Sequence, residues 1–490
     1  MTKALPVPDA DSYDEFCEDC GYEPELKRTL SSFQMFAVSF AFISVAVGIF
    51  GTYDDVLRNT GPVGIWTWII AAAGQMLVAL VIAQFAGRIP LIGTSYQWAS
   101  RLANPKVGWF FGWVTFCYLF TGLMAIDSAM SSTCLMPLFN LAPNEVTART
   151  ITMVVMVIQA VLAIASTRLM ALVNSTAVAI ELTIVVVLAV ALLVAVAVTG
   201  HGSVDNLTSR GLTAGATNYF AFGGGLMAVM IVGLGTLVGF ESAVNMSEEA
   251  KDPFRSVPRA IVVSVAAASL LGMVFLIALT VAIENVPKVS AAGSPVAMIM
   301  HDQLGTVTER IFLTAIAIAF FGGGLVTLTT CARMIFGMSR DYRFPASRLL
   351  RRVNERTQTP IPATVLAVVT GIAVLAVLPG NALLNLITAG TVFPALTYGM
   401  IVILYLSVRK RLDRQEGAFD IGRFETPVSI AALVWSICSL VALLSPASAR
   451  VPIMIVTGLL VVGGLYFTYM MIFNRDVLDN EPGEAGVFAH

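Results

Sequence analysis

Residues 42–51 read Phe-Ile-Ser-Val-Ala-Val-Gly-Ile-Phe-Gly, and residues 232–241 read Val-Gly-Leu-Gly-Thr-Leu-Val-Gly-Phe-Glu. Both stretches lie inside apolar segments long enough to cross a membrane, and both place glycines near mid-membrane depth. Interrupted segments at corresponding places in two halves of a chain are typical of the substrate site of a transporter. The alternative is ordinary helix packing, because small residues let helices approach closely.

The composition around these stretches is that of a membrane protein. Of 490 residues, 57% are hydrophobic and only 12% are charged, and the mean hydropathy is +0.82. A soluble domain carries roughly a quarter of its residues as charged side chains. The lipid bilayer is therefore the expected partner. A net charge of −2 excludes a nucleic-acid partner, which would require a clustered basic face.

Long apolar runs predict an all-α polytopic membrane protein with twelve transmembrane helices. The predicted helices are 33–58, 63–88, 107–136, 147–167, 170–199, 219–246, 258–284, 306–339, 360–379, 384–408, 427–446 and 451–473. An even number of spans places both termini on one side of the membrane.

The distribution of Lys and Arg predicts which side that is. With the N-terminus inside, 23 of these residues fall in inner segments and six in outer ones. The positive-inside rule then assigns residues 1–32 and 474–490 to cytoplasmic tails of a plasma (inner) membrane protein. Residues 1–32 contain no apolar stretch of the kind found in a cleavable signal peptide, so none is expected.

Ionisable side chains at membrane depth are functional candidates, because their burial is unfavourable. Glu181 lies near mid-bilayer in the predicted helix 170–199 and has no Lys or Arg beside it, which suits a proton-coupling role. Glu241 follows the glycines of the sixth segment and is a second candidate. The alternative is that it only accepts hydrogen bonds from backbone N–H groups freed by the helix break. Asp127 lies in the outer part of the third segment, and we expect it to face the outer vestibule.

The helix breaks predict the chemistry of the substrate. Freed N–H groups at the start of a half-helix present a positive dipole end, which suits a carboxylate. Freed carbonyl groups at the end of the preceding half suit an ammonium group or Na⁺. A small zwitterion or amine therefore fits better than a sugar.

Other classes of protein are excluded by what the chain does not contain. Its three histidines (His201, His301 and His490) fall in predicted outer loops or the tail, so no catalytic residues, metal site or cofactor are expected and an enzyme is not favoured. No phosphate-binding loop motif indicates ATP drive. Cys17 and Cys20 form a single CxxC pair, which is a weak metal or redox signal and is more often two cytosolic thiols.

Several motifs in order resemble the amino acid/choline transporter family of the amino acid–polyamine–organocation superfamily. They are GYEPELKRTLS at 21–31, GIFGTY at 48–53, PLIGTSYQW at 90–98, GFESA at 239–243, SEEAKDP at 247–253 and RMIFGMSRD at 333–341. Each motif is weak alone, but together they are specific and cover residues 21 to about 410.

The resemblance implies a 5+5 inverted repeat, 33–199 and 219–408, in which helices one and six are discontinuous. This transport core, 33–408, is followed by 409–473 with two appended helices. The resemblance also implies a substrate site and a coupling site. The substrate-binding residues would be Ser44, Val45, Ala46, Val47, Gly48, Gly235, Thr236, Leu237, Val238 and Gly239. The ion or proton would be held by Glu181 and Thr329 or Thr330, with Glu241 as a further candidate.

Departures from the family pattern leave alternatives open. Glu181 stands where relatives can carry a lysine that mimics bound sodium. Coupling to H⁺ and coupling to Na⁺ therefore both remain possible mechanisms. Gly235 replaces a gating aromatic residue found in some members. The expected function is secondary active transport of an amino acid or related small amine by alternating access. An amino acid/amine exchanger, a choline or polyamine permease and, more remotely, a nutrient sensor are the alternatives. Either a monomer or a homodimer is expected.

Overall fold

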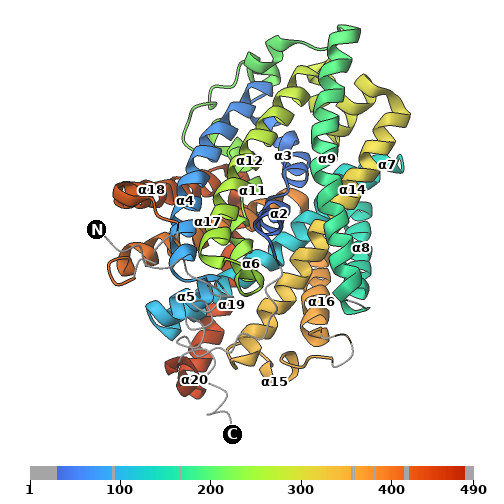
Figure 1. Ribbon diagram of the computed structural model, residues 1–490. Helices are drawn as coiled ribbons and strands as arrows, with labels where there is room; N and C mark the ends of the chain where they lie inside the picture. Colours follow the sequence, from blue (N-terminus) through green and yellow to red (C-terminus); the bar gives the residue numbers. More distant parts are fainter. Residues whose placement is uncertain are drawn as a thin grey trace.

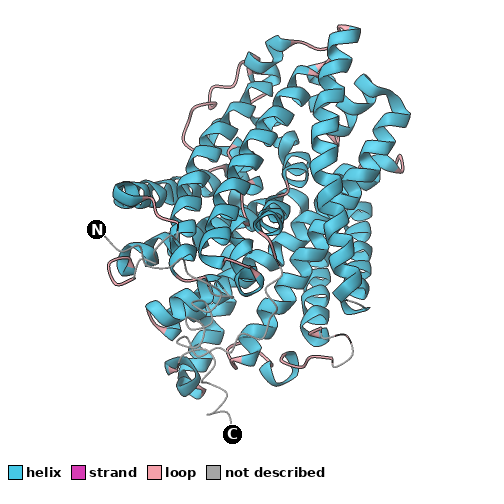
Figure 2. Cartoon of the chain, viewed as in Figure 1, coloured by secondary structure: helices cyan, strands magenta, loops and turns pink. Residues whose placement is uncertain are grey.

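The computed structural model describes residues 30–90, 94–165, 167–354, 357, 359–378, 382–412 and 419–480. The cysteine pair Cys17 and Cys20, the motif residues before Leu30 and the last ten residues lie outside this range. Within the described residues the chain is helical and contains no β-strand, as Figure 2 shows, apart from one isolated bridge between Leu30 and Ala250.

Eleven helical segments are long and apolar enough to cross a membrane, and a twelfth, α16, is shorter at Ile361–Val377. The prediction of about twelve membrane helices is confirmed. The eleven are α2 with α3 (Ser32–Ile43, Val45–Asn59), η1 with α4 (Pro62–Trp66, Thr67–Arg88), α6 with η2 and α7 (Pro105–Ala129, Met130–Leu135, Met136–Leu138), α8 (Glu145–Ala165), α9 (Thr167–Thr199), α10 with α11 and η5 (Gly225–Val229, Ile231–Thr236, Phe240–Glu249), α12 (Pro253–Val281), α14 (Pro295–Arg340), α17 (Ala382–Val408), η6 with α18 (Gly422–Phe424, Glu425–Leu444) and η7 with α19 (Ala447–Ala449, Arg450–Phe473).

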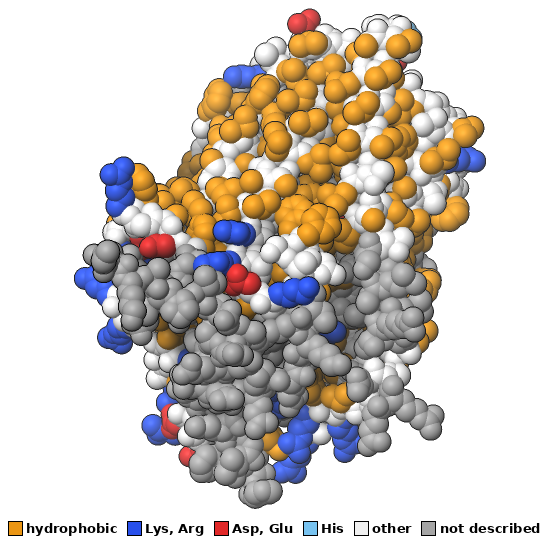
Figure 3. Space-filling model, viewed as in Figure 1, with side chains coloured by type: hydrophobic (Ala, Val, Ile, Leu, Met, Phe, Trp, Pro, Cys, Tyr) orange, Lys and Arg blue, Asp and Glu red, His pale blue; other side chains and the backbone are white. Residues whose placement is uncertain are grey.

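Short helices lie between these segments or, in the case of α20, follow the last one. They are α5 (Thr94–Leu102), η3 (Val204–Thr208), η4 (Gly211–Thr213), α13 (Val286–Ser290), α15 (Ser347–Leu350) and α20 (Arg475–Asp479). In Figure 3 the visible face carries a broad apolar band, and Lys, Arg, Asp and Glu gather mainly below it with a few at the opposite end. This pattern is expected where lipid surrounds the middle of a helical bundle.

The predicted starts of two segments are wrong. The eighth segment begins at Pro295 rather than 306, with a kink at Gly305, where φ is 76°. The sixth segment begins later than predicted. The sequence predicts a helix from 219, but residues 219–224 form turns, and the helix begins at Gly225. Gly223 has a φ of 72°, in the left-handed region, which prevents a regular helix there. Apolarity alone could not reveal this, because Tyr219, Phe220 and Phe222 are as apolar as a helix interior.

Both helices that the sequence predicts to be broken are interrupted. The chain turns at Ser44 between α2 and α3, where φ is 40° and ψ is 81°. It turns again between α11 and η5, where Gly239 has a φ of 83°. Figure 1 shows α2 and α3 in the middle of the bundle, with α4 on one side and α9 and α14 on the other.

Close packing of the outer helices holds this centre in place. Trp68 of α4 is fully buried, donates to the carbonyl of Ser269 at 2.8 Å and lies against Gly272 of α12. A Cβ atom at Gly272 would be 2.2 Å from the indole ring, so only glycine allows this contact. The helices α4 and α12 therefore pack closely against each other, next to the interrupted helices α2 and α11.

A buried polar cluster ties the end of the chain to the end of the bundle that carries α5 and α15. Arg343 donates to Tyr96 at 3.3 Å and to the carbonyl of Val477 at 3.2 Å. Tyr96 donates in turn to Asp341 at 2.8 Å. Burial raises the pKa of Tyr96 well above its ordinary value, so the hydroxyl keeps its proton and remains a donor.

Candidate functional site

A cavity of about 100 Å³ lies beside both helix breaks. It is lined by Phe42, Ile43, Ser44, Val47, Gly48, Gly51, Thr52, Tyr118, Leu119, Gly122, Ala125, Ile126, Ala129, Gly235, Val238, Thr327, Ile387, Gly390 and Thr391. These residues come from α2, α3, α6, α11, α14 and α17 and from the helix-six break. The lining contains hydroxyl groups but no Asp, Glu, Lys, Arg or His. The space exceeds that of one water molecule severalfold and can hold a small solute.

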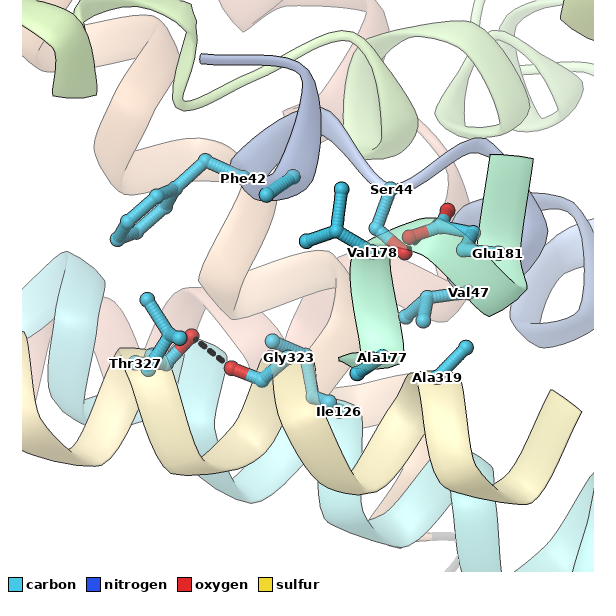
Figure 4. A pocket seen from close by; sticks show the side chains of 12 residues that line it. Phe42, Ser44, Val47, Ile126, Ala177, Val178, Glu181, Ala319, Gly323 and Thr327 are labelled. Carbon is cyan, nitrogen blue, oxygen red and sulfur yellow. Dashed lines mark hydrogen bonds between the residues drawn. The ribbon is translucent and has the colours of Figure 1, made fainter. Parts of the chain in front are cut away.

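A smaller cavity of about 30 Å³ adjoins the first and brings in Glu181. The two cavities share Ser44, Val47 and Thr327 among their lining residues. Figure 4 shows Ser44 and Glu181 side by side, with Val47 next to them and Thr327 on the facing helix α14. A carboxyl group and the helix-one break are therefore next to the same space.

Glu181 caps the start of α3. Its Oε1 atom accepts hydrogen bonds from Ser44 Oγ at 2.8 Å and from the Ala46 N–H at 3.2 Å. The first N–H groups of a helix have no partner within the helix, and a carboxylate there also interacts favourably with the helix dipole. Glu181 is 4% exposed. The sequence predicted a coupling group at Glu181 but gave no indication that it would hold the helix-one break.

The helix-six break is held by Tyr398 of α17. Its hydroxyl accepts from the Gly239 N–H at 2.8 Å and donates to Glu241 at 2.7 Å. Glu241 lines neither cavity, so its placement fits the alternative in which it satisfies groups around the break. Sequence reasoning missed Tyr398. A tyrosine in a predicted membrane helix was the available signal, because a buried hydroxyl requires a partner.

Two glycines near the breaks do different work. A Cβ atom at Gly48 would lie 2.1 Å from Thr236 Oγ1, so Gly48 allows α3 and α11 to touch. A Cβ atom at Gly235 would lie 3.0 Å from Thr391 Oγ1. Gly235 lines the larger cavity, so the absence of its side chain leaves that space open.

The structure brings half of the predicted substrate residues to the cavity. Ser44, Val47, Gly48, Gly235 and Val238 line it. The other five, which do not line it, are Val45, Ala46, Thr236, Leu237 and Gly239. Of these, Val45, Ala46 and Leu237 are fully buried in the core and Thr236 is 1% exposed.

The predicted coupling threonines lie off the cavity. Thr329 and Thr330 both donate to the carbonyl of Val326 at 2.9 Å, and neither lines a cavity. Thr327 lines both cavities instead and donates to the carbonyl of Gly323 at 2.8 Å, as Figure 4 shows. Positions two and three residues apart on a helix point in different directions, so the sequence could not select among three nearby threonines.

Asp127 does not face an outer vestibule, and that expectation is wrong. The residue is fully buried, and its Oδ1 atom accepts from Gln159 Nε2 of α8 at 2.8 Å. Within the described part of the chain, no group of three or more His, Cys, Asp and Glu side chains is placed to hold a metal ion.

Comparison with known proteins places this arrangement in context. The profile of a family described as amino acid permeases matches residues 30–463. Amino-acid permease BAT1 of Arabidopsis thaliana is 26% identical over 470 residues, which cover 88% of this chain and 87% of the relative. Its homolog in Oryza sativa subsp. japonica is 26% identical over 451 residues, covering 85% of this chain and 84% of the relative. The GABA-specific permease of Saccharomyces cerevisiae is 26% identical over 374 residues, covering 72% of this chain and 64% of the relative.

Proposed function

The chain belongs to the amino acid permease family, and on this premise we propose that it carries its amino acid by alternating access, as a secondary active transporter driven by protons. The substrate is an amino acid or closely related amine with an uncharged side chain. The transporter lies in the plasma (inner) membrane, with both termini in the cytoplasm. The excess of Lys and Arg in the predicted inner segments supports this orientation.

Proton coupling is supported by one observation above all: Glu181 occupies the helix end that suits a substrate carboxylate. Its carboxylate accepts from Ser44 Oγ and the Ala46 N–H at the start of α3. Val47, in the same first turn, lines the larger cavity. An ionised Glu181 and a substrate carboxylate would repel each other there. A proton on Glu181 removes one of the two charges, so proton and substrate binding favour each other reciprocally.

The same site offers a place for the amino group. The last carbonyl groups of α11 lack partners within their helix; those of Gly233 and Thr236 accept from the Leu237 and Val238 N–H groups, each at 2.9 Å, and Gly235 in that turn lines the cavity. A substrate ammonium placed there would interact with the negative end of the helix dipole. The carboxylate and ammonium of one substrate would thus bridge the two interrupted helices.

The rest of the lining favours an uncharged side chain. Gly51, Gly122, Gly390 and Ala129 leave space beside the breaks, and no ionised side chain lines the larger cavity. Transfer of a charged side chain into such surroundings without a partner is unfavourable by several kcal/mol, about the penalty for a buried unpaired ion. This supports a neutral amino acid over a polyamine.

Uptake into proteoliposomes tests the proposal. Purified protein is reconstituted, and labelled neutral amino acids, GABA, choline and spermidine are offered with an inward proton gradient, an inward Na⁺ gradient or neither. We expect the proton gradient to drive accumulation of a neutral amino acid without Na⁺. Stimulation by Na⁺ alone would contradict proton coupling, and flux that requires internal substrate would identify an exchanger. No flux under any condition would contradict transport itself.

A further inference from the structure

A second buried carboxyl group lies apart from Glu181, between α6, α8 and α14. Asp127 and Gln159 are both fully buried. Gln159 Nε2 donates to Asp127 Oδ1 at 2.8 Å and to the carbonyl of Phe321 at 3.3 Å. Neither Asp127 nor Gln159 lines the cavities described above. The hydrogen-bonded pair therefore does not bind a substrate in those cavities directly.

Counting donors and acceptors shows that this pair is one hydrogen short. Both hydrogens of the Gln159 amide are used, whereas Asp127 Oδ2 and Gln159 Oε1 are buried acceptors without a partner. Buried polar atoms are nearly always paired. A single proton on Asp127 Oδ2 turns that atom into a donor, and Gln159 Oε1 is the unpaired acceptor on the neighbouring side chain.

The surrounding backbone is shaped for this pair. A Cβ atom at Gly324 would lie 2.3 Å from Asp127 Oδ1 and 2.4 Å from Gln159 Nε2, so only glycine leaves room for them. The π-helix η2 begins at Met130, three residues after Asp127, and such π-bulges occur frequently at functional sites. Ser131 in this turn donates to the Asp127 carbonyl at 2.8 Å.

We infer that Asp127 and Gln159 form a second proton-binding site, which takes up and releases a proton as the transporter changes conformation. The proton enters from water onto Oδ2 and returns to water, so only an O–H bond forms and breaks. Asp127 and Gly324 each follow a cavity-lining residue in the chain. Ile126 lines both cavities, and Gly323 lines the smaller one (Figure 4). A shift of α6 against α14 would therefore open the site to the same water that enters the cavities.

Within the described residues Asp127 forms no ion pair. On the elements packed around it, several charged or titratable groups contact other partners: Arg149 with Glu145 on α8, Arg58 with Asp54 on α3, Cys134 with Thr133 in η2, His301 with Glu309 on α14, and Tyr398 of α17 with Glu241. A metal ion such as Na⁺ would require further oxygen ligands and space, and neither cavity described above includes Asp127 or Gln159. The ligand is therefore assigned as a proton.

Proton counting in proteoliposomes tests this site separately from Glu181. A trapped pH indicator reports protons moved per labelled substrate for wild type, Asp127→Asn, Gln159→Leu and the control Thr364→Val, which removes a buried hydroxyl from α16. We expect Asp127→Asn to move one proton fewer per substrate. Gln159→Leu should shift the pH midpoint of uptake, and Thr364→Val should change neither. Substrate counterflow, which requires no net proton movement, reports that each variant is folded.

Infrared difference spectra of the wild type remove the dependence on a folded variant. A protonated aspartic acid gives a carbonyl band that moves when the aspartates carry carbon-13, and we expect this band to change between substrate-free and substrate-bound protein. An unchanged proton count and pH profile in a counterflow-active Asp127→Asn, or no aspartic acid band in the wild type, would overturn the inference. A loss of pH dependence in Glu181→Gln alone would support the proposed coupling and still refute a role for Asp127.

Discussion

Replacing Glu181 by glutamine tests whether proton and substrate meet at the start of α3. Glutamine keeps the side-chain length and an acceptor oxygen for Ser44 Oγ–H and the Ala46 N–H, the two groups that Glu181 accepts from. It cannot lose a proton and so cannot acquire a charge. We therefore expect Glu181→Gln to bind substrate at every pH as tightly as the protonated wild type does.

The size of the effect follows from the geometry of the helix end. A substrate carboxylate at the first turn of α3 would lie about 5 Å from the Glu181 carboxylate, and two like charges at that distance repel by about 3 kcal/mol at an effective dielectric constant of about 20. This corresponds to roughly a hundredfold change in affinity. Wild-type affinity is highest at low pH, where Glu181 carries its proton. It falls as pH rises, by at most about tenfold per pH unit for one linked proton.

Binding assays from about pH 5 to about pH 9 measure this difference directly. Ser44→Ala is the matched control, because it removes one hydrogen bond to Glu181 but leaves a carboxyl group that titrates. Choline, which has no carboxylate, should not lose affinity as pH rises. The reasoning is refuted if Glu181→Gln keeps the wild-type pH dependence, or if choline and the amino acid respond to pH in the same way.

Three further substitutions test the cavity and the contacts between helices. Gly235→Trp should fill the cavity and abolish uptake of all but the smallest substrates, with Gly235→Ala as the control; full-rate transport by the tryptophan variant would show that Gly235 is misplaced. Gly48→Ala brings a methyl group against Thr236 and should lower stability by about 1–3 kcal/mol. Adding Thr236→Gly, which also removes the Thr236 Cβ that would lie 2.5 Å from the new methyl group, should recover part of the loss in unfolding temperature unless the two residues are not in contact. Glu425→Ala removes the carboxylate that lies 3.2 Å from the buried Arg88 guanidinium. We expect the free energy of unfolding to fall by about 3–5 kcal/mol in chemical denaturation, because a buried charge then lacks its partner, and to fall less in Glu425→Gln. Equal losses in the two variants would contradict a charge effect.

The membrane helices could be predicted from the sequence because they depend on a summed property. Each needs a long apolar run, and the average over such a run survives errors at individual positions. The breaks could be predicted only approximately. In helix one the left-handed residue is Ser44, whereas Gly48 is helical and provides a close contact. Glycines indicate an unusual helical segment, but the sequence does not show whether a given glycine allows a backbone turn or a close contact with another helix.

The site residues depend on which way a side chain points, and this was beyond the sequence. Thr327, Thr329 and Thr330 lie within one helical turn, yet only Thr327 lines the cavities. Asp127 was assigned to an outer vestibule by its depth along the helix, whereas its partner Gln159 lies 32 residues away on another helix. The rotation of a helix about its axis and its pairing with other helices follow from tertiary packing. A membrane helix that is apolar on all sides gives no sequence pattern from which these can be predicted.

The three consecutive glycines of α14 show how these faces combine. A Cβ atom at Gly322 would lie 2.2 Å from Ala177 Cβ, so Gly322 lets α9, the helix of Glu181, approach closely. Gly323 lines the cavity beside Glu181, and Gly324 makes room for Asp127. Successive residues point about 100° apart on a helix, so this triplet serves three neighbours at one depth. A shift of α14 would therefore alter the surroundings of both carboxyl groups and the cavity together, which is the connection that coupled transport requires.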